Sequence, residues 1–241
     1  MRAEILSVGT ELLLGQIIDT NAAYIARELA ALGIDVYFKQ TVGDNPQRIQ
    51  DTLRLALGRA DAVLVTGGLG PTEDDLTVEA VAQALGEELV ENPQVSDHVR
   101  RFFAARGRTP TPNVFKQALI PRNARVIPNT RGTAPGIHLE RDGKMIFIMP
   151  GVPFEMEGMM RDYIIPVLRA RTSGLIIQSL VLRVTGEGES AVEMRIKDLL
   201  AGTAPTIAPY AKLGEVHLRL TAKGTAEVAA AQLAAGERLV R

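Results

Sequence analysis

The sequence has no cysteine and no tryptophan, and aromatic residues make up only 4% of its 241 residues. The lack of cysteine excludes disulfide bonds, thiol catalysis and cysteine-ligated metal sites. Few aromatic side chains are present to stack on nucleic-acid bases, and 27 Lys and Arg against 28 Asp and Glu leave no basic excess. We therefore do not expect nucleic acid to be a partner of this chain.

Long apolar runs are also missing. No stretch is long enough to cross a membrane, and the apolar part of MRAEILSVG is too short for a signal peptide. A phosphate-binding P-loop motif is absent, and the three histidines are too scattered to suggest a metal site or a catalytic triad. The composition, 46% hydrophobic and 23% charged, is that of a soluble globular protein. We expect a cytoplasmic protein with no membrane partner.

The most informative stretch covers residues 62–79 and reads AVLVTGGLGPTEDDLTVE. Residues 62–65 are apolar and β-branched, which predicts a buried strand. Residues 66–71 contain three glycines, which let the backbone approach a ligand closely and turn successive N–H groups toward an anion. The stretch therefore predicts a phosphate-binding loop that follows a strand.

Carboxylates follow this loop directly. We expect residues 72–77 to open a helix that runs to about Ala84, with Asp74 and Asp75 in its first turn. The structural alternative is a tight strand-to-helix turn in which these carboxylates only stabilise the helix start. Carboxylates beside a phosphate would repel it, so the combination favours a divalent cation between them.

The first part of the chain alternates strand and helix patterns. Strands are expected at 3–8, 35–42 and 62–65, and helices at 22–32 and 46–59. Thr20 or Asn21 would cap the first helix. This alternation predicts a parallel sheet with right-handed crossovers, in which ligands bind beyond the carboxyl ends of the strands.

Acidic residues follow three of these strand ends. Glu11, Asp44 and Asp75 could therefore converge on one crevice, with Asn21 as a further member. Asp44 and Asp75 are the pair that we single out, because together they could ligate a metal or position a water molecule.

The next part predicts a helix at 93–106, a hairpin with strands at 136–139 and 144–149, and a helix at 154–169 that Pro166 could kink. The PGVP loop, residues 150–153, again lies between a strand and a helix. The basic residues from Arg100 to Arg108 are either a solvated helix end or a clamp for a substrate phosphate.

The pattern changes after Thr172, which predicts two domains, residues 1–172 and 173–241. The second shows the order βαββα and suits a small α+β, KH-like domain. Its elements are expected at 176–185, 190–200, 206–208, 214–221 and 226–240. A basic G-x-x-G loop is absent there, which argues against RNA binding.

Four segments together resemble one family: GTELLLGQIIDTN, VGDN, TGGLGPTEDDLT and PGVPFEM, in this order. They are similar to the CinA (competence-damage-inducible protein) family, which is related to the MogA/MoeA molybdopterin-binding domains. The resemblance covers residues 1 to about 170. It implies an α/β fold, a MogA-like three-layer α/β/α sandwich with a mainly parallel sheet, followed by a KH-like domain.

The resemblance also implies an activity. It is the metal-dependent hydrolysis of the pyrophosphate of ADP-ribose to AMP and ribose 5-phosphate, in pyridine-nucleotide recycling, by a homo-oligomer such as a dimer. The cofactor would be a divalent ion such as Mg²⁺, Mn²⁺ or Co²⁺, and a monovalent cation is a further candidate. Many family members carry an additional nicotinamide mononucleotide deamidase domain, which we do not expect within these 241 residues.

The expected site residues lie in the matching segments. Asp75 and Asp44 would hold the metal and, with Glu11, act in catalysis. Substrate binding is assigned to Thr10, Asn21, Thr66, Gly67, Gly68, Gly70, Pro150, Gly151 and Pro153. Two other hypotheses stay open: a molybdopterin- or nucleotide-binding scaffold without turnover, and an interaction protein that uses its small C-terminal domain.

Overall fold

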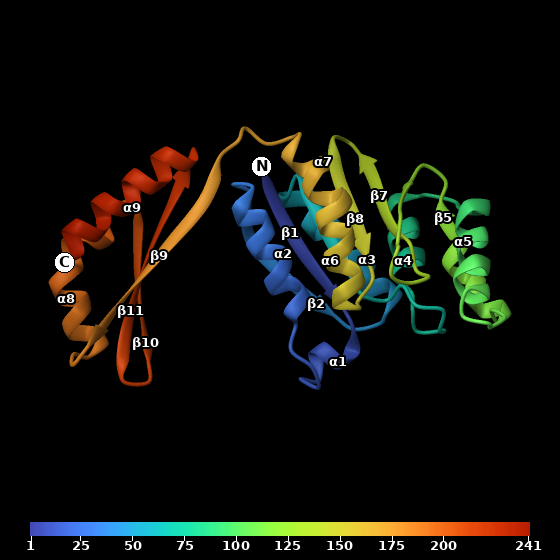
Figure 1. The fold of residues 1–241 in the computed structure, drawn as a ribbon, viewed down its shortest axis with the longest axis horizontal. Coiled ribbons are helices and arrows are strands. Elements are labelled where there is room, and N and C mark those ends of the chain that lie inside the picture. Colours follow the sequence, from blue (N-terminus) through green and yellow to red (C-terminus); the bar gives the residue numbers. More distant parts are fainter. The chain divides into compact units, whose positions relative to one another are not determined.

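The computed structural model describes residues 1–241, which divide into two compact units (Figure 1). Unit 1 comprises residues 1–29 and 35–170, and unit 2 comprises residues 30–34 and 171–241. No helix has the length and apolar character needed to span a bilayer.

Unit 1 is built on a six-stranded sheet with the order β2-β1-β3-β8-β7-β6. The first four strands in this order are parallel, and each of the last two runs antiparallel to the strand before it. The mainly parallel sheet expected from the sequence is therefore confirmed. The strands are β1 (Arg2–Val8), β2 (Asp35–Val42), β3 (Ala62–Thr66), β6 (Arg125–Ile127), β7 (Gly136–Arg141) and β8 (Lys144–Met149).

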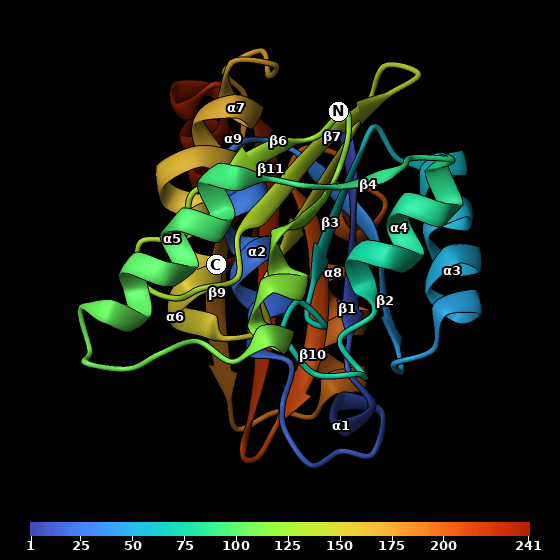
Figure 2. The same ribbon diagram turned by 90° about the vertical axis from the view of Figure 1, so that its right-hand side faces the viewer.

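Helices cover both faces of this sheet, as Figure 2 shows. On one face lie α3 (Pro46–Arg59) and α4 (Thr77–Leu85), and on the other lie α2 (Thr20–Ala31) and α6 (Pro153–Met159). β3 is buried along its whole length because apolar side chains point to both helical layers. This arrangement is the expected three-layer sandwich.

The course of the chain creates a crevice beside β1. The crossover through α2 places β2 on one side of β1, and the return through α3 places β3 on the other. Two crossovers that diverge from one strand define a topological switch point, where ligands bind beyond the carboxyl ends of the strands. The carboxyl ends of β1, β3 and β8 point to this place.

Shorter elements complete unit 1. β4 pairs with β5 in a two-stranded antiparallel ribbon, and the helix η1, a 3₁₀ helix, directly precedes β5. The bounds are α1 (Thr10–Leu13), β4 (Leu89–Glu91), α5 (Pro93–Ala104), η1 (Pro112–Ala118), β5 (Leu119–Pro121), the π-helical turn η2 (Met160–Ile164) and α7 (Ile165–Arg169).

Several expected helix bounds were wrong. The helix expected to open at residues 72–77 begins at Thr77, because Asp75 accepts a hydrogen bond from the backbone N–H of Thr72 and closes a turn instead. Local side-chain bonds of this kind compete with helix formation. Asp19, rather than Thr20 or Asn21, accepts from the backbone of Ala22 at the start of α2.

Two other segments differ in detail from the expectation. The helix expected at 154–169 consists of α6, η2 and α7, so a π-helical turn interrupts it before Pro166. The segment 10–13, for which no helix was predicted, forms the short helix α1.

Unit 2 has the expected βαββα order. Its antiparallel sheet has the order β10-β11-β9, and side chains of α8 and α9 share one core with it, as Val192, Leu220 and Leu233 do. The small α+β domain is therefore confirmed. Its elements are β9 (Ile176–Thr185), α8 (Glu189–Leu200), β10 (Thr206–Lys212), β11 (Glu215–Gly224) and α9 (Ala226–Val240).

The boundary after Thr172 stays a prediction about independent folding. A fragment of residues 1–172 keeps the complete six-stranded sheet, so we expect one cooperative urea-unfolding transition. The matched fragment that ends at residue 140 lacks β8, which pairs with β3 in the middle of the sheet, and should not fold. A broad, non-cooperative transition of the 1–172 fragment would contradict the boundary.

Candidate functional site

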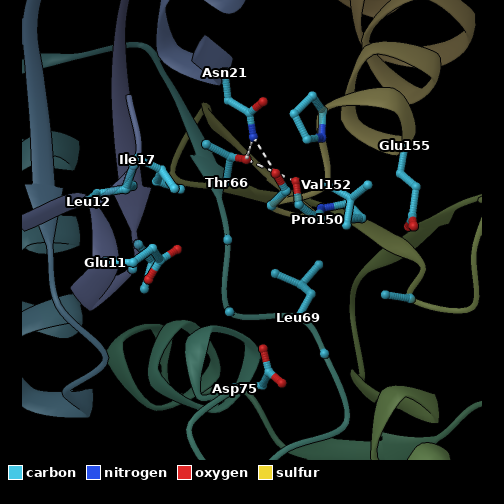
Figure 3. Close-up of a pocket in the computed structure, with 18 of the residues that line it drawn as sticks. Glu11, Leu12, Ile17, Asn21, Thr66, Leu69, Asp75, Pro150, Val152 and Glu155 are labelled. Carbon is cyan, nitrogen blue, oxygen red and sulfur yellow. Dashed lines mark hydrogen bonds between the residues drawn. The ribbon is translucent and has the colours of Figure 1, made fainter. Parts of the chain in front are cut away.

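A cavity of about 480 Å³ lies at the carboxyl ends of β1, β3 and β8 (Figure 3). This volume is in the range of small-molecule sites. Most residues predicted from the sequence line it, and they come from segments far apart in the chain. They are Glu11, Asn21, Asp44, Thr66, Gly67, Gly68, Gly70, Asp75, Pro150, Gly151 and Pro153.

Hydrogen bonds of Thr66 and Asn21 connect three of the segments that line the cavity (Figure 3). The Thr66 hydroxyl donates to the Pro150 carbonyl at 3.0 Å and accepts from Asn21 Nδ2 at 3.1 Å. Asn21 Nδ2 also donates to the Gly151 carbonyl at 2.8 Å. These bonds fix the start of α2, the end of β3 and the PGVP loop relative to one another.

Thr10 does not line the cavity, in contrast to the expectation that it binds substrate. Instead, its backbone N–H and its hydroxyl both donate to Asp44 Oδ2, each at 2.8 Å. No protein group donates to Asp44 Oδ1. Thr10 is therefore a positioning residue that anchors one oxygen of the Asp44 carboxylate and leaves the other free.

Asp75 is held in a similar way. Its Oδ2 accepts from the backbone N–H of Thr72 at 2.9 Å and lies 2.6 Å from the Thr72 hydroxyl, while Oδ1 has no protein partner. The carboxylate packs directly on Gly70, where an added Cβ would lie 2.3 Å from Oδ2. Only glycine at position 70 therefore leaves space for this carboxylate.

The neighbouring carboxyl of Asp74 also lines the cavity and contacts Thr72. The hydrogen bond from the Thr72 hydroxyl, together with the backbone amide of Asp74 and the charge of Lys116, lowers the pKa of Asp74 below its usual value. These contacts therefore stabilise the ionised form of Asp74.

The glycine loop offers fewer amides than its sequence suggests. The N–H of Gly67 donates to the Met149 carbonyl, so it is not available to a ligand. Gly67 has φ 106°, and a Cβ there would lie 2.0 Å from the Val8 carbonyl oxygen. The amides of Gly68, Leu69 and Gly70 donate to no group of the chain, so they remain to bind an anion.

Side chains of η1 hold the glycine loop in place. Gln117 donates to the Leu69 carbonyl at 3.0 Å, and Asn113 donates to the Pro71 carbonyl at 3.3 Å. Lys116 Nζ donates to the carbonyls of Thr72, at 3.2 Å, and Asp75, at 2.6 Å. These bonds satisfy the loop's carbonyls on one side.

All ionisable side chains that line the cavity are acidic. Six carboxylates line it, and no Lys, Arg or His does. Unpaired carboxylates at this density would repel a phosphate, so a bound anion requires a cation beside it. The six are Glu11, Asp19, Asp44, Asp74, Asp75 and Glu155.

The polar lining residues that sequence reasoning missed include Asp19, Gln117 and Glu155. Asp19 belongs to the segment GTELLLGQIIDTN but was given no role from the sequence; it accepts from the Ser7 hydroxyl and caps α2. Gln117 came from a segment with no recognisable motif. Glu155 belongs to the segment PGVPFEM, so the motif itself held a signal for it.

The basic residues from Arg100 to Arg108 do not line the cavity. Arg100 pairs with Asp97, and the Arg106 guanidinium lies over the Phe102 ring at 3.5 Å. The structure therefore gives no support to a phosphate clamp at this cavity.

Comparisons with known proteins define the class of both units. The family model described as a probable molybdopterin binding domain matches residues 4–170, and the model described as the damage-inducible protein CinA KH domain matches residues 179–241. Unit 1 thus belongs to the class of probable molybdopterin binding domains. The crystal structure of the protein CinA from Thermoplasma acidophilum is 38% identical, with a TM-score of 0.63, over 67% of this chain and 94% of its own. The chain belongs to the CinA family.

Curated relatives are longer than this chain. A CinA-like protein of Dictyoglomus turgidum is 52% identical over 98% of this chain but only 57% of its own length. A CinA-like protein of Dictyoglomus thermophilum is 53% identical over 92% of this chain and 54% of its own. The chain therefore spans somewhat more than half the length of these relatives.

The role of η1 generates a stability prediction. Lys116→Met removes two hydrogen bonds from a charged donor and the 3.2 Å ion pair with Glu79, so we expect a loss of about 2 kcal/mol in the free energy of unfolding. Urea denaturation measures it. The control Arg122→Met breaks the exposed pair with Glu88 and should cost less than about 1 kcal/mol. Equal effects of both changes would mean that Lys116 does not anchor the loop.

Proposed function

We propose that this chain is a metal-dependent hydrolase that cleaves the pyrophosphate of ADP-ribose to AMP and ribose 5-phosphate. The observation that carries the proposal is the shared cavity of free glycine-loop amides and the Asp44 and Asp75 carboxylates. Amides recognise an anion, while the carboxylates demand a cation. A diphosphate with a divalent ion satisfies both requirements.

The donor set fits a divalent cation that shares its ligands with the substrate. Asp44 and Asp75 each present one oxygen without a protein partner, and their other oxygen is anchored by a threonine. Anchoring of this kind orients metal ligands. No three acidic or histidine side chains form a complete metal cage. Mg²⁺-type sites use one or two carboxylates, completed by substrate phosphates and water.

Each residue then has a defined task. The amides of Gly68, Leu69 and Gly70 bind phosphate oxygens, and Asp44 and Asp75 would hold the ion. When bound, the ion lowers the pKa of a coordinated water and neutralises phosphate charge. Glu11 lines the cavity near Gly9 and is the carboxylate available to accept a proton from the attacking water.

The free acceptors of two buried amides support a polar ligand. Asn21 Oδ1 and Gln117 Oε1 have no hydrogen-bond partner in the protein, although both residues are buried, with only 8% of each exposed. A scaffold that binds a nucleotide or a molybdopterin without turnover would use the same amides and acceptors. Product formation distinguishes the hydrolase from this scaffold.

Asp75→Asn provides the main test. The amide keeps an acceptor for the Thr72 N–H, so the turn and the fold should persist, whereas the charge for the ion is lost. We expect turnover of ADP-ribose with divalent metal to fall at least about 100-fold, the order expected for one main electrostatic contributor to the transition state. Metal-free nucleotide affinity should hold or rise, since a repulsive charge has gone.

The matched control is Glu73→Gln, which removes a charge from the same turn at a residue that does not line the cavity. It should leave turnover within about 2-fold of the wild-type rate. Near wild-type turnover in folded Asp75→Asn protein would refute the metal-site assignment and favour Asp74 or the scaffold.

The interaction hypothesis for unit 2 leads to a separate prediction. The net charge of −1 and the absence of a basic G-x-x-G loop predict only weak RNA binding, which added salt removes. Filter binding with single-stranded RNA of several sequences measures it. Tight, sequence-selective binding at physiological salt would make unit 2 a nucleic-acid module.

A further inference from the structure

Glu155 is the carboxylate of the cavity that the proposed hydrolysis does not use. It lies in the first turn of α6 and lines the cavity next to Thr133 and Ala134. Figure 3 shows it on the side of the cavity opposite Glu11 and well separated from Asp75. Glu155 is therefore not placed to join Asp75 in holding the ion.

A buried asparagine holds Glu155 in place. Asn129 is 5% exposed, and its Nδ2 donates to Glu155 Oε2 at 2.6 Å and to the Ala134 carbonyl at 2.8 Å. Asn129 Oδ1 accepts from the backbone N–H groups of Arg131 and Gly132. The side chain of Asn129 thus links the backbone of Arg131, Gly132 and Ala134 to Oε2 of Glu155.

The surroundings of Glu155 contain no cation that would neutralise it. Arg131 is the nearby candidate, but its Nη1 donates to the Phe154 carbonyl and its guanidinium lies over the Phe154 ring at 3.9 Å. No ion pair involves Glu155, and its Oε1 accepts from no protein group. At Gly132, an added Cβ would lie 2.3 Å from Oε2, so the loop leaves space for the carboxylate. The result is an oriented, unpaired acceptor.

Such a group selects for hydrogen-bond donors. An ionised carboxylate only accepts, and after the Asn129 bond it still has lone pairs on both oxygens. Two adjacent hydroxyls of a ribose can donate one bond to each oxygen. Carboxylates of dinucleotide-binding folds recognise ribose hydroxyls by the same chemistry.

We propose that Glu155, oriented by Asn129, binds the vicinal hydroxyls of a ribose of the ligand and so makes the site selective for ribonucleotides. This inference rests on the proposed function in that the ligand is a nucleotide whose phosphates lie at the glycine loop. It adds a specificity-determining subsite on the α6 side of the cavity.

Calorimetric titration tests the subsite without turnover. The probes are ADP, 2′-deoxy-ADP, 3′-deoxy-ADP and inosine diphosphate, each with Mg²⁺. Wild-type protein should bind ADP about 10-fold or more tightly than either deoxy analogue, the size expected for a lost bond to a charged group. In Glu155→Gln this ratio should fall to about 2-fold, because the amide nitrogen cannot accept.

The ratio is measured within one protein, so a partial loss of folded material in the variant does not change it. Glu157→Gln serves as the matched control, since it removes a charge from α6 at a residue that does not line the cavity. Its ratio should equal that of the wild-type protein.

The outcomes separate the inference from the proposed hydrolysis. Equal binding of ADP and the deoxy analogues by wild-type protein, or full discrimination in Glu155→Gln, overturns the ribose subsite. Loss of discrimination against inosine diphosphate alone in Glu155→Gln would mean that Glu155 recognises the base amino group, which also overturns it. Discrimination as expected without ADP-ribose turnover supports the subsite and refutes the hydrolase. No binding of ADP refutes both.

Discussion

The Thr66 hydroxyl is the contact on which the site depends. Thr66 is the last residue of the central strand β3. Its hydroxyl donates to the Pro150 carbonyl and accepts from Asn21, which in turn donates to the Gly151 carbonyl. Each of these groups is buried or partly buried, so a missing partner would leave an unsatisfied polar atom at a cost of about 1–3 kcal/mol. This requirement brings the ends of two strands and the start of α2 together, and the cavity forms between them.

The negative charge of the cavity limits which ligands it can bind more than its shape does. Threonines anchor Asp44 and Asp75 through one oxygen each and leave the other oxygen exposed to the cavity. Cations that could neutralise these groups lie elsewhere, as Lys116 does when it binds the loop carbonyls from behind. The site therefore keeps an uncompensated negative charge, which favours a cation over an anion.

Much of the fold followed from local patterns. The strands at 35–42 and 144–149 were predicted correctly, because alternation and buried apolar runs act over a few positions. The start of α4 was not, since the turn that Thr72 and Asp75 close resembles a helix N-terminus in sequence.

The sequence by itself determined the class of fold, the position of the glycine loop and 11 of the 25 residues that line the cavity, because motifs at the ends of parallel strands must meet at one edge of a sheet. Only the tertiary structure decided what each side chain does there. Thr10 holds Asp44 instead of a ligand, the Gly67 amide serves Met149, and Glu155 takes its orientation from Asn129. These assignments depend on contacts between residues far apart in the chain, and no local pattern encodes them.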